Sequence, residues 1–212
     1  MDYIREPQEI YRRSFAIVEQ EAALDDLPID MRPIAIRIIH ACGMVDAVDD
    51  LIWSENAVAA GRKALGDGCK IFTDVEMVKA GIIARHLPKD VETICTLNDP
   101  QTPALAKDIG NTRSAAGVDL WGEALAGAIV VIGNAPTALF RLLELLDEGA
   151  PRPALILGFP VGFVGAAESK EELVQNSRGC EFITLKGRRG GSAIASAALN
   201  GLANGIAEGV GT

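Results

Sequence analysis

Apolar residues follow two different spacings along the chain, and the spacing changes near Cys69. Before that point, Ile34, Ile38 and Ile39 recur at the short interval of an amphipathic helix, so the first sixty-odd residues are predicted to be helical. After it, short runs rich in Ile, Val, Leu and Phe alternate with amphipathic segments. The runs cover 70–73, 93–97, 128–132, 154–158 and 182–185.

Most of these runs lack the polar alternation of a strand with one wet face, and strands buried on both faces are typical of parallel sheets. The segments between them are predicted helices. Repeated strand–helix alternation predicts an α/β fold: one domain over residues 1–212, with a mostly parallel sheet of about five strands flanked by helices. Ligands then bind beyond the carboxyl ends of the strands. The expected helices cover 75–84, 103–109, 114–125, 136–147, 169–177 and 192–207.

The composition of the chain limits both the cell compartments in which the protein is expected and the kinds of site that it can form. Apolar residues make up 49% of the chain, yet no apolar run reaches the roughly 18 residues of a membrane helix, and the charged N-terminus lacks the apolar centre of a secretory signal. A cytoplasmic protein without a membrane partner is expected. The four cysteines have no CxxC spacing and only two histidines accompany them, so neither a disulfide nor a metal site is predicted.

The net charge of −9 argues against a nucleic-acid partner, and it means that an acidic ligand needs a local cluster of cations. Lys186, Arg188 and Arg189 form such a cluster between the last predicted strand and the last predicted helix. Gly190 and Gly191 would let a ligand approach the backbone there. The segment lacks the spacing of a phosphate-binding Walker loop. Carboxylate binding is favoured over a solvated basic turn.

Two further corners follow predicted strands. At 132–139, Asn134 is expected to cap the helix that starts near Pro136, with free backbone N–H groups facing an anion; an ordinary strand–helix corner is the alternative. The loop 158–170 is apolar and rich in glycine. It fits an apolar wall for a flat ligand, a contact with a neighbouring subunit, or both.

Arg113 stands at the predicted start of a helix, between Thr112 and Ser114, either of which can cap that helix. A cation at this end opposes the helix dipole, which favours a ligand role over a surface role. His40 lies near the end of an apolar helix that Gly43 terminates. It fits either a core histidine or an acid/base, and as an acid/base it is preferred to the other histidine, in the loop at 84–88.

These motifs together resemble the precorrin-8X methylmutase family, nearly from end to end of the chain. The resemblance implies a parallel α/β fold and a homodimer. It also implies an isomerase that moves a methyl group from C-11 to C-12 of the precorrin macrocycle by a 1,5-sigmatropic shift, giving hydrogenobyrinic acid without a redox cofactor. The segments that carry it are 11–15, 39–43, 111–116, 132–139, 160–170 and 187–193.

The resemblance assigns His40 as proton donor and acceptor and Ser14 as a substrate contact. The second arginine of the basic segment departs from the family, so Arg188 is preferred to Arg189. Three rival functions stay open: a tetrapyrrole carrier without catalysis, a cobalt-precorrin-8 methylmutase and, disfavoured by the missing fingerprint, a phosphate-binding transferase. Hand-over of product to neighbouring pathway enzymes is also envisaged. The predicted substrate contacts are Ser14, Arg113, Ser114, Asn134, Arg188, Gly190 and Gly191.

Overall fold

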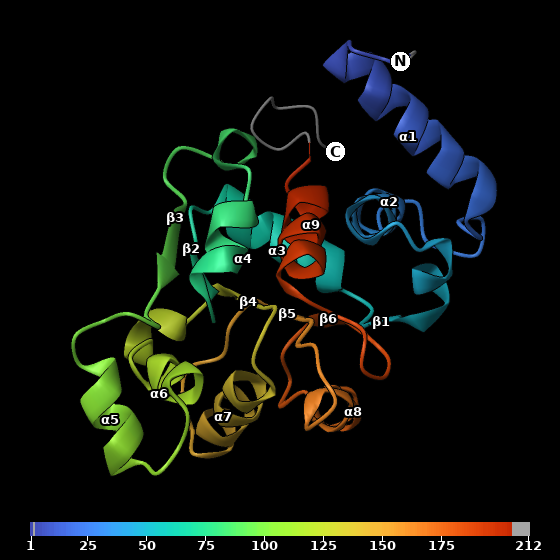
Figure 1. The fold of residues 1–212 in the computed structure, drawn as a ribbon. Coiled ribbons are helices and arrows are strands. Elements are labelled where there is room, and N and C mark those ends of the chain that lie inside the picture. Colours follow the sequence, from blue (N-terminus) through green and yellow to red (C-terminus); the bar gives the residue numbers. More distant parts are fainter. Residues whose placement is uncertain (2, 205–212) are drawn as a thin grey trace.

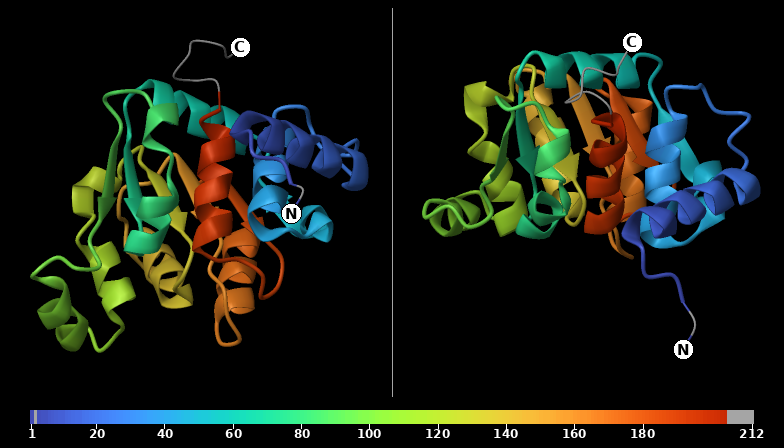
Figure 2. Two further views of the ribbon diagram at one scale, coloured as in Figure 1. Left: turned by 45° about the horizontal axis from the view of Figure 1, so that its top comes forward. Right: turned by 90° about the horizontal axis from the view of Figure 1, so that it is seen from above.

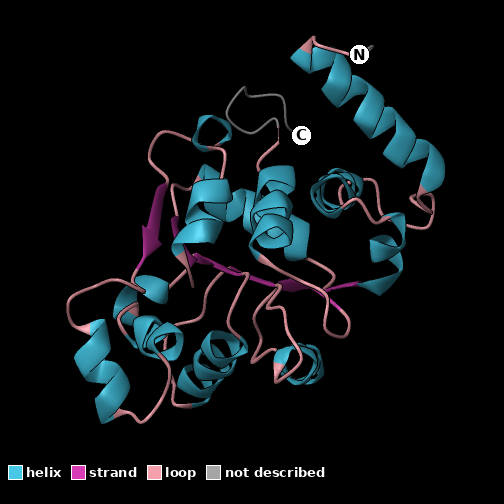
Figure 3. Cartoon of the chain, in the orientation of Figure 1, coloured by secondary structure: helices cyan, strands magenta, loops and turns pink. Residues whose placement is uncertain are grey.

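The computed structural model describes residue 1 and residues 3–204, which form a six-stranded sheet between two layers of helices (Figures 1 and 3). The strands lie in the order β1-β6-β5-β4-β2-β3, and every neighbouring pair is parallel except β1 with β6. The mostly parallel α/β fold is thereby confirmed. The strands are β1 (Leu51–Trp53), β2 (Lys70–Thr73), β3 (Glu92–Cys95), β4 (Ile129–Ile132), β5 (Leu155–Gly158) and β6 (Phe182–Leu185).

Each face of the sheet has its own hydrophobic core, which explains why the central strands are apolar throughout. In β4, Ile129 and Val131 belong to one core, while Val130 and Ile132 belong to the other. One face is covered by α2 (Arg32–Cys42), α3 (Ala57–Gly66), α4 (Glu76–Gly81) and α9 (Ser192–Leu202). The other is covered by α6 (Arg113–Asp119), α7 (Pro136–Asp147) and α8 (Ala166–Gln175), and α5 (Thr102–Asp108) packs against α6 at the margin of this layer.

The sheet has one strand more than predicted. Strand β1 lies in the region expected to be helical, and that expectation is wrong for residues 51–53, which pair antiparallel with β6 at the edge of the sheet. Three residues are too few to show a period. The expected helix 114–125 is also interrupted, because α6 ends at Asp119 and a short 3-10 helix follows at Gly122–Leu125. The last expected helix ends at Leu202, and residues 205–207 of it lie outside the described part of the chain.

Helices α2 and α9 pack closely and in opposite directions. Gly201, near the end of α9, lies so near the start of α2 that an added Cβ would meet the Ile34 Cα at 2.7 Å. The end of α2 therefore lies beside the start of α9, at the carboxyl ends of the parallel strands. Helix α1 (Pro7–Glu21) lies at the margin of the molecule, next to α2 and away from the sheet (Figure 2).

Candidate functional site

His40 lies in the last turn of α2, which ends at Gly43 in a left-handed conformation (φ 69°). Its side chain is exposed rather than buried in the core, and α1 surrounds it on one side. Ser14 Oγ lies 2.8 Å from His40 Nδ1. The Tyr11 ring stacks on the imidazole at 5.6 Å, and the Phe15 ring meets it edge-on at 5.3 Å. Three residues of α1 thus fix the orientation of the imidazole.

The surroundings of His40 favour its neutral form. Burial lowers the pKa of the imidazole, and the nearby Arg37 guanidinium lowers it further. A neutral imidazole has one N–H. Ser14 can donate to Nδ1 and leave the proton on Nε2, or accept from Nδ1 and leave Nε2 free. The hydroxyl can therefore pair with either tautomer of the neutral imidazole, and it accepts from Nδ1 when the ring is protonated on both nitrogens.

His40 also borders an open hollow of about 390 Å³ between α2, α4 and α9. The walls combine small residues with a few polar groups, which is typical of ligand sites. Asn200 helps to shape it, because its side chain accepts from the backbone N–H of Ile83 (2.8 Å) and donates to the carbonyl of Gly81 (3.0 Å). Lining residues include Arg37, His40, Met77, Gly81, Ser196 and Asn200.

The two arginines of the basic segment have different surroundings. Arg188 is exposed, and its guanidinium lies 5.0 Å from the centre of the Phe163 ring. Arg189 instead pairs with Asp46 at 2.6 Å and with Asp50 at 3.4 Å. Within residues 3–204, no carboxylate lies within ion-pair distance of Arg188. Arg188 is therefore the arginine that can bind an external carboxylate.

Gly190 and Gly191 join their loop to the neighbouring one. A Cβ on Gly190 would lie 2.3 Å from the Phe159 carbonyl oxygen and 2.5 Å from that of Pro160, so only glycine fits. The Gly191 N–H donates to the Phe159 carbonyl at 2.9 Å. Both glycines thus have a structural reason to be there, and their contact with substrate stays a prediction.

The corner at 132–139 differs from expectation, because its backbone N–H groups are not free. The N–H groups of Gly133, Asn134 and Ala135 all donate to the carboxylate of Asp74, at 2.9, 2.9 and 2.8 Å. Burial raises the pKa of Asp74, and these three donors oppose that shift. The expected anion site is therefore wrong, since a side chain of the protein occupies it.

The expected cap by Asn134 is also wrong. Ala135 holds the cap position of α7 and makes no side-chain bond there, while the Asn134 side chain is exposed at the sheet edge. Asn134 as a substrate contact stays a prediction.

Arg113 and Ser114 lie at the start of α6, near the carboxyl ends of the strands. His40 lies at the same ends of the strands but on the opposite face of the sheet. Thr112 caps that helix, accepting from the Ala115 N–H at 3.2 Å. The Arg113 guanidinium donates to the Leu97 carbonyl and to Asn98 Oδ1, both at 2.9 Å. Within one chain, Arg113 and Ser114 do not line the His40 hollow.

Sequence reasoning missed several residues that shape the site. Tyr11 and Phe15 could have been found from their position within one helical turn of Ser14, which places all three near one face of a helix. Asp74 gave no comparable signal, because it lies 59 residues before the first N–H that it accepts.

Comparison with known proteins points to one family. A family model described as precorrin-8X methylmutase matches residues 9–205. The precorrin-8X methylmutase of Pseudomonas aeruginosa is 59% identical over 203 residues, covering 96% of this chain and 98% of that protein. That of a Sinorhizobium species is 55% identical, covering 95% and 96%. A crystal structure of precorrin-8X methylmutase from Thermus thermophilus matches with a TM-score of 0.86 and 36% identity, covering 97% of this chain and 98% of that one.

Proposed function

Because the chain belongs to the precorrin-8X methylmutase family, we propose that it isomerises precorrin-8X by moving the C-11 methyl group to C-12, giving hydrogenobyrinic acid. The observation that carries the proposal is the exposed His40 imidazole, bonded to Ser14 at the edge of an open hollow. The family makes the protein an isomerase that acts on a precorrin. The role of each residue is our proposal.

His40 is the proton donor and acceptor of this mechanism. In its imidazolium form it gives the Nε2 proton to a ring nitrogen of the macrocycle, which favours the tautomer from which the methyl group migrates. The neutral imidazole then takes the proton back after the shift. Nδ1 keeps its proton throughout this cycle and donates to Ser14 Oγ, which holds the ring with Nε2 toward the substrate. General acid catalysis of this kind contributes about 10²–10⁴-fold to the rate.

Arg188 holds a substrate carboxylate from the loop that precedes α9, whose residue Ala193 lines the hollow, and the start of α9 adds a favourable potential for the same anion. The exposed Phe163 and Val164 of the neighbouring loop offer an apolar wall for the macrocycle. These contacts fix one geometry of a flexible substrate, which is how positioning accelerates a rearrangement within one molecule.

A homodimer is part of the proposal. Helix α1 exposes Ile10, Tyr11 and Ile17, which suits burial against a second copy. Arg113 and Ser114 do not line the His40 hollow of their own chain, and we propose that they contact substrate in the hollow of the second copy. Mixed dimers of His40→Ala and Arg113→Ala chains should then regain part of the activity that both parents lack. Mixtures as inactive as the parents would contradict shared sites.

The central test is conversion of precorrin-8X by the His40→Ala variant, followed by absorption spectroscopy, beside titration with hydrogenobyrinic acid. Turnover should be lost while the dissociation constant of the product changes little. His86→Ala is the matched control and should keep its activity. Normal turnover in His40→Ala would remove this residue from the mechanism.

Two alternatives have their own outcomes in the same assay. A tetrapyrrole carrier binds the product but converts no substrate even as wild type. A cobalt-precorrin-8 methylmutase turns over the cobalt-containing substrate and leaves the metal-free one unchanged. The names of the relatives at 59% and 55% identity support the metal-free substrate.

We further propose one precorrin isomerase domain over residues 1–212, a cytoplasmic location and hand-over of product to neighbouring pathway enzymes. The family match over 9–205 supports the first. The four free thiols suit a reducing compartment and support the second. Among the described residues, no helix is long and apolar enough to cross a membrane.

A further inference from the structure

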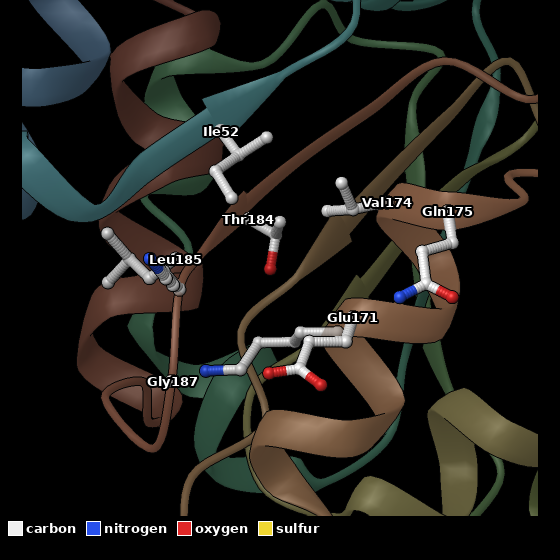
Figure 4. Close-up of a pocket in the computed structure, with 9 residues that line it drawn as sticks. Ile52, Glu171, Val174, Gln175, Thr184, Leu185 and Gly187 are labelled. Atoms are coloured by element: carbon white, nitrogen blue, oxygen red, sulfur yellow. The ribbon is translucent and has the colours of Figure 1, made fainter.

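Lys170 is a buried cation that the mechanism does not use. It lies on α8 with 1% of its surface exposed, and its Nζ donates to the backbone carbonyl of Arg189. It also borders a small pocket of about 190 Å³, which lies between the strand carrying Ile52 and the helix carrying Val174 (Figure 4). An ammonium group removed from water is destabilising unless it is well bonded, so this contact needs a reason.

Arg189 is held at both of its ends. Lys170, from one face of the sheet, binds its carbonyl oxygen, while Asp46 and Asp50, from the 3-10 helix Val45–Asp50, bind its guanidinium. The backbone N–H of Lys186 also donates to the Asp50 carbonyl, at 2.8 Å. The segment that bears Arg188 is therefore fastened from two directions.

The loop 186–191 is joined to the loop 159–165 as well. The Gly162 N–H donates to the Arg188 carbonyl at 3.4 Å, the Gly191 N–H donates to the Phe159 carbonyl at 2.9 Å, and the Arg188 guanidinium lies over Phe163. The two loops form one unit at the edge of the sheet. Of the two arginines in this unit, Arg188 has no ion pair within the described residues, whereas Arg189 pairs with Asp46.

We propose that Lys170 is a positioning residue for the methylmutase reaction: by holding the Arg189 carbonyl, it keeps Arg188 where a substrate carboxylate meets it. This inference rests on the proposed role of Arg188 in binding substrate. Burial lowers the pKa of Lys170 to about 8, with Asp50 opposing the shift, so the residue is charged at neutral pH. The other charged groups around it are Glu171 and Lys186, which line the same pocket.

The test is a double-mutant cycle on the full-length protein, with the dissociation constant of hydrogenobyrinic acid as the readout. Lys170→Met should weaken binding about three- to tenfold, because Arg188 must then be ordered when the ligand binds. In the Arg188→Ala background the same change should have little further effect. Full additivity, or unchanged affinity in Lys170→Met, would overturn the inference.

Hydrogen exchange separates this inference from the proposed function. Lys170→Met should speed exchange of the Gly191 amide, whereas Leu173→Ala should not. Leu173 is a fully buried neighbour on α8, and its truncation destabilises the protein without touching the Arg189 carbonyl. If Arg188→Ala leaves product affinity unchanged, the proposed role of Arg188 is wrong. Hydrogen exchange of the Gly191 amide then tests by itself whether Lys170 holds this loop. Unchanged exchange in Lys170→Met refutes the inference in either case.

Discussion

Replacing Asp74 by Asn keeps the shape of the side chain but removes the charge and turns one acceptor into a donor. In the native chain one carboxylate oxygen accepts from Gly133 and the other from Asn134 and Ala135. An amide can point its oxygen at the latter pair, and its NH₂ group then faces the N–H of Gly133. That N–H is buried, so no water can replace the lost acceptor.

The size of the effect follows from these contacts. One buried N–H without an acceptor costs about 1–3 kcal/mol, and two bonds that lose a charged partner weaken as well. The neutral amide of Asn avoids the cost of burying a carboxylate, which offsets part of this loss. We therefore expect the free energy of unfolding to fall by about 2–4 kcal/mol. For a chain of this size, that corresponds to a melting temperature lower by roughly 5–15 °C.

Thermal unfolding followed by circular dichroism measures this shift. Asp99→Asn is the matched control, because Asp99 Oδ1 accepts from the Gln101 N–H in a loop and an amide oxygen can still do so. That variant should stay within about 0.5 kcal/mol of wild type. An Asp74→Asn protein that melts together with both wild type and Asp99→Asn would refute the view that this carboxylate holds the corner.

Three further predictions use simpler measurements. Ser14→Ala should lower turnover roughly tenfold, the equivalent of one lost hydrogen bond, with little change in product affinity; equal turnover would show that the hydroxyl has no part in proton transfer. Gly190→Ala should destabilise the protein by about 1–3 kcal/mol, because its Cβ collides with two carbonyl groups, whereas Gly66→Ala meets no atom within 4 Å and should melt no lower than wild type. Burial lowers the pKa of Lys170 from 10.5 to about 8, so the unfolded chain binds more protons between these values. Urea titrations should therefore find that wild type gains stability over Lys170→Met as the pH rises from 8 to 10.5, and a constant difference would contradict the shift.

The fold could be predicted where local pattern and tertiary packing agree. The run at 128–132 is apolar throughout because alternate residues of β4 enter two different cores, and this identified a strand buried on both faces. Strand β1 gave no such signal, because three residues at an edge are placed by pairing with β6 rather than by their own period.

The site was predictable only in part. Gly43 is typical of a helix end and Thr112 of a helix start, and both predicted boundaries are confirmed. The contact of Ser14 with His40 spans 26 residues and depends on how α1 packs on α2, so the residues alone did not suggest it. The prediction of an anion site at 133–135 was wrong for a related reason. Its backbone N–H groups look free in the local sequence, but they donate to a carboxylate that is distant along the chain.

Helix α1 supplies Ser14, Tyr11 and Phe15 to the imidazole, yet Val18 is its only buried residue. Segments with so little surface buried in their own subunit detach in local fluctuations once a covering second copy is lost, while the rest of the protein stays intact. Heat inactivation should therefore precede global unfolding, as the helix leaves His40 while the two cores still hold the sheet. His40, the proposed proton donor and acceptor, therefore lies where the least stable helix of the molecule contacts its stable core.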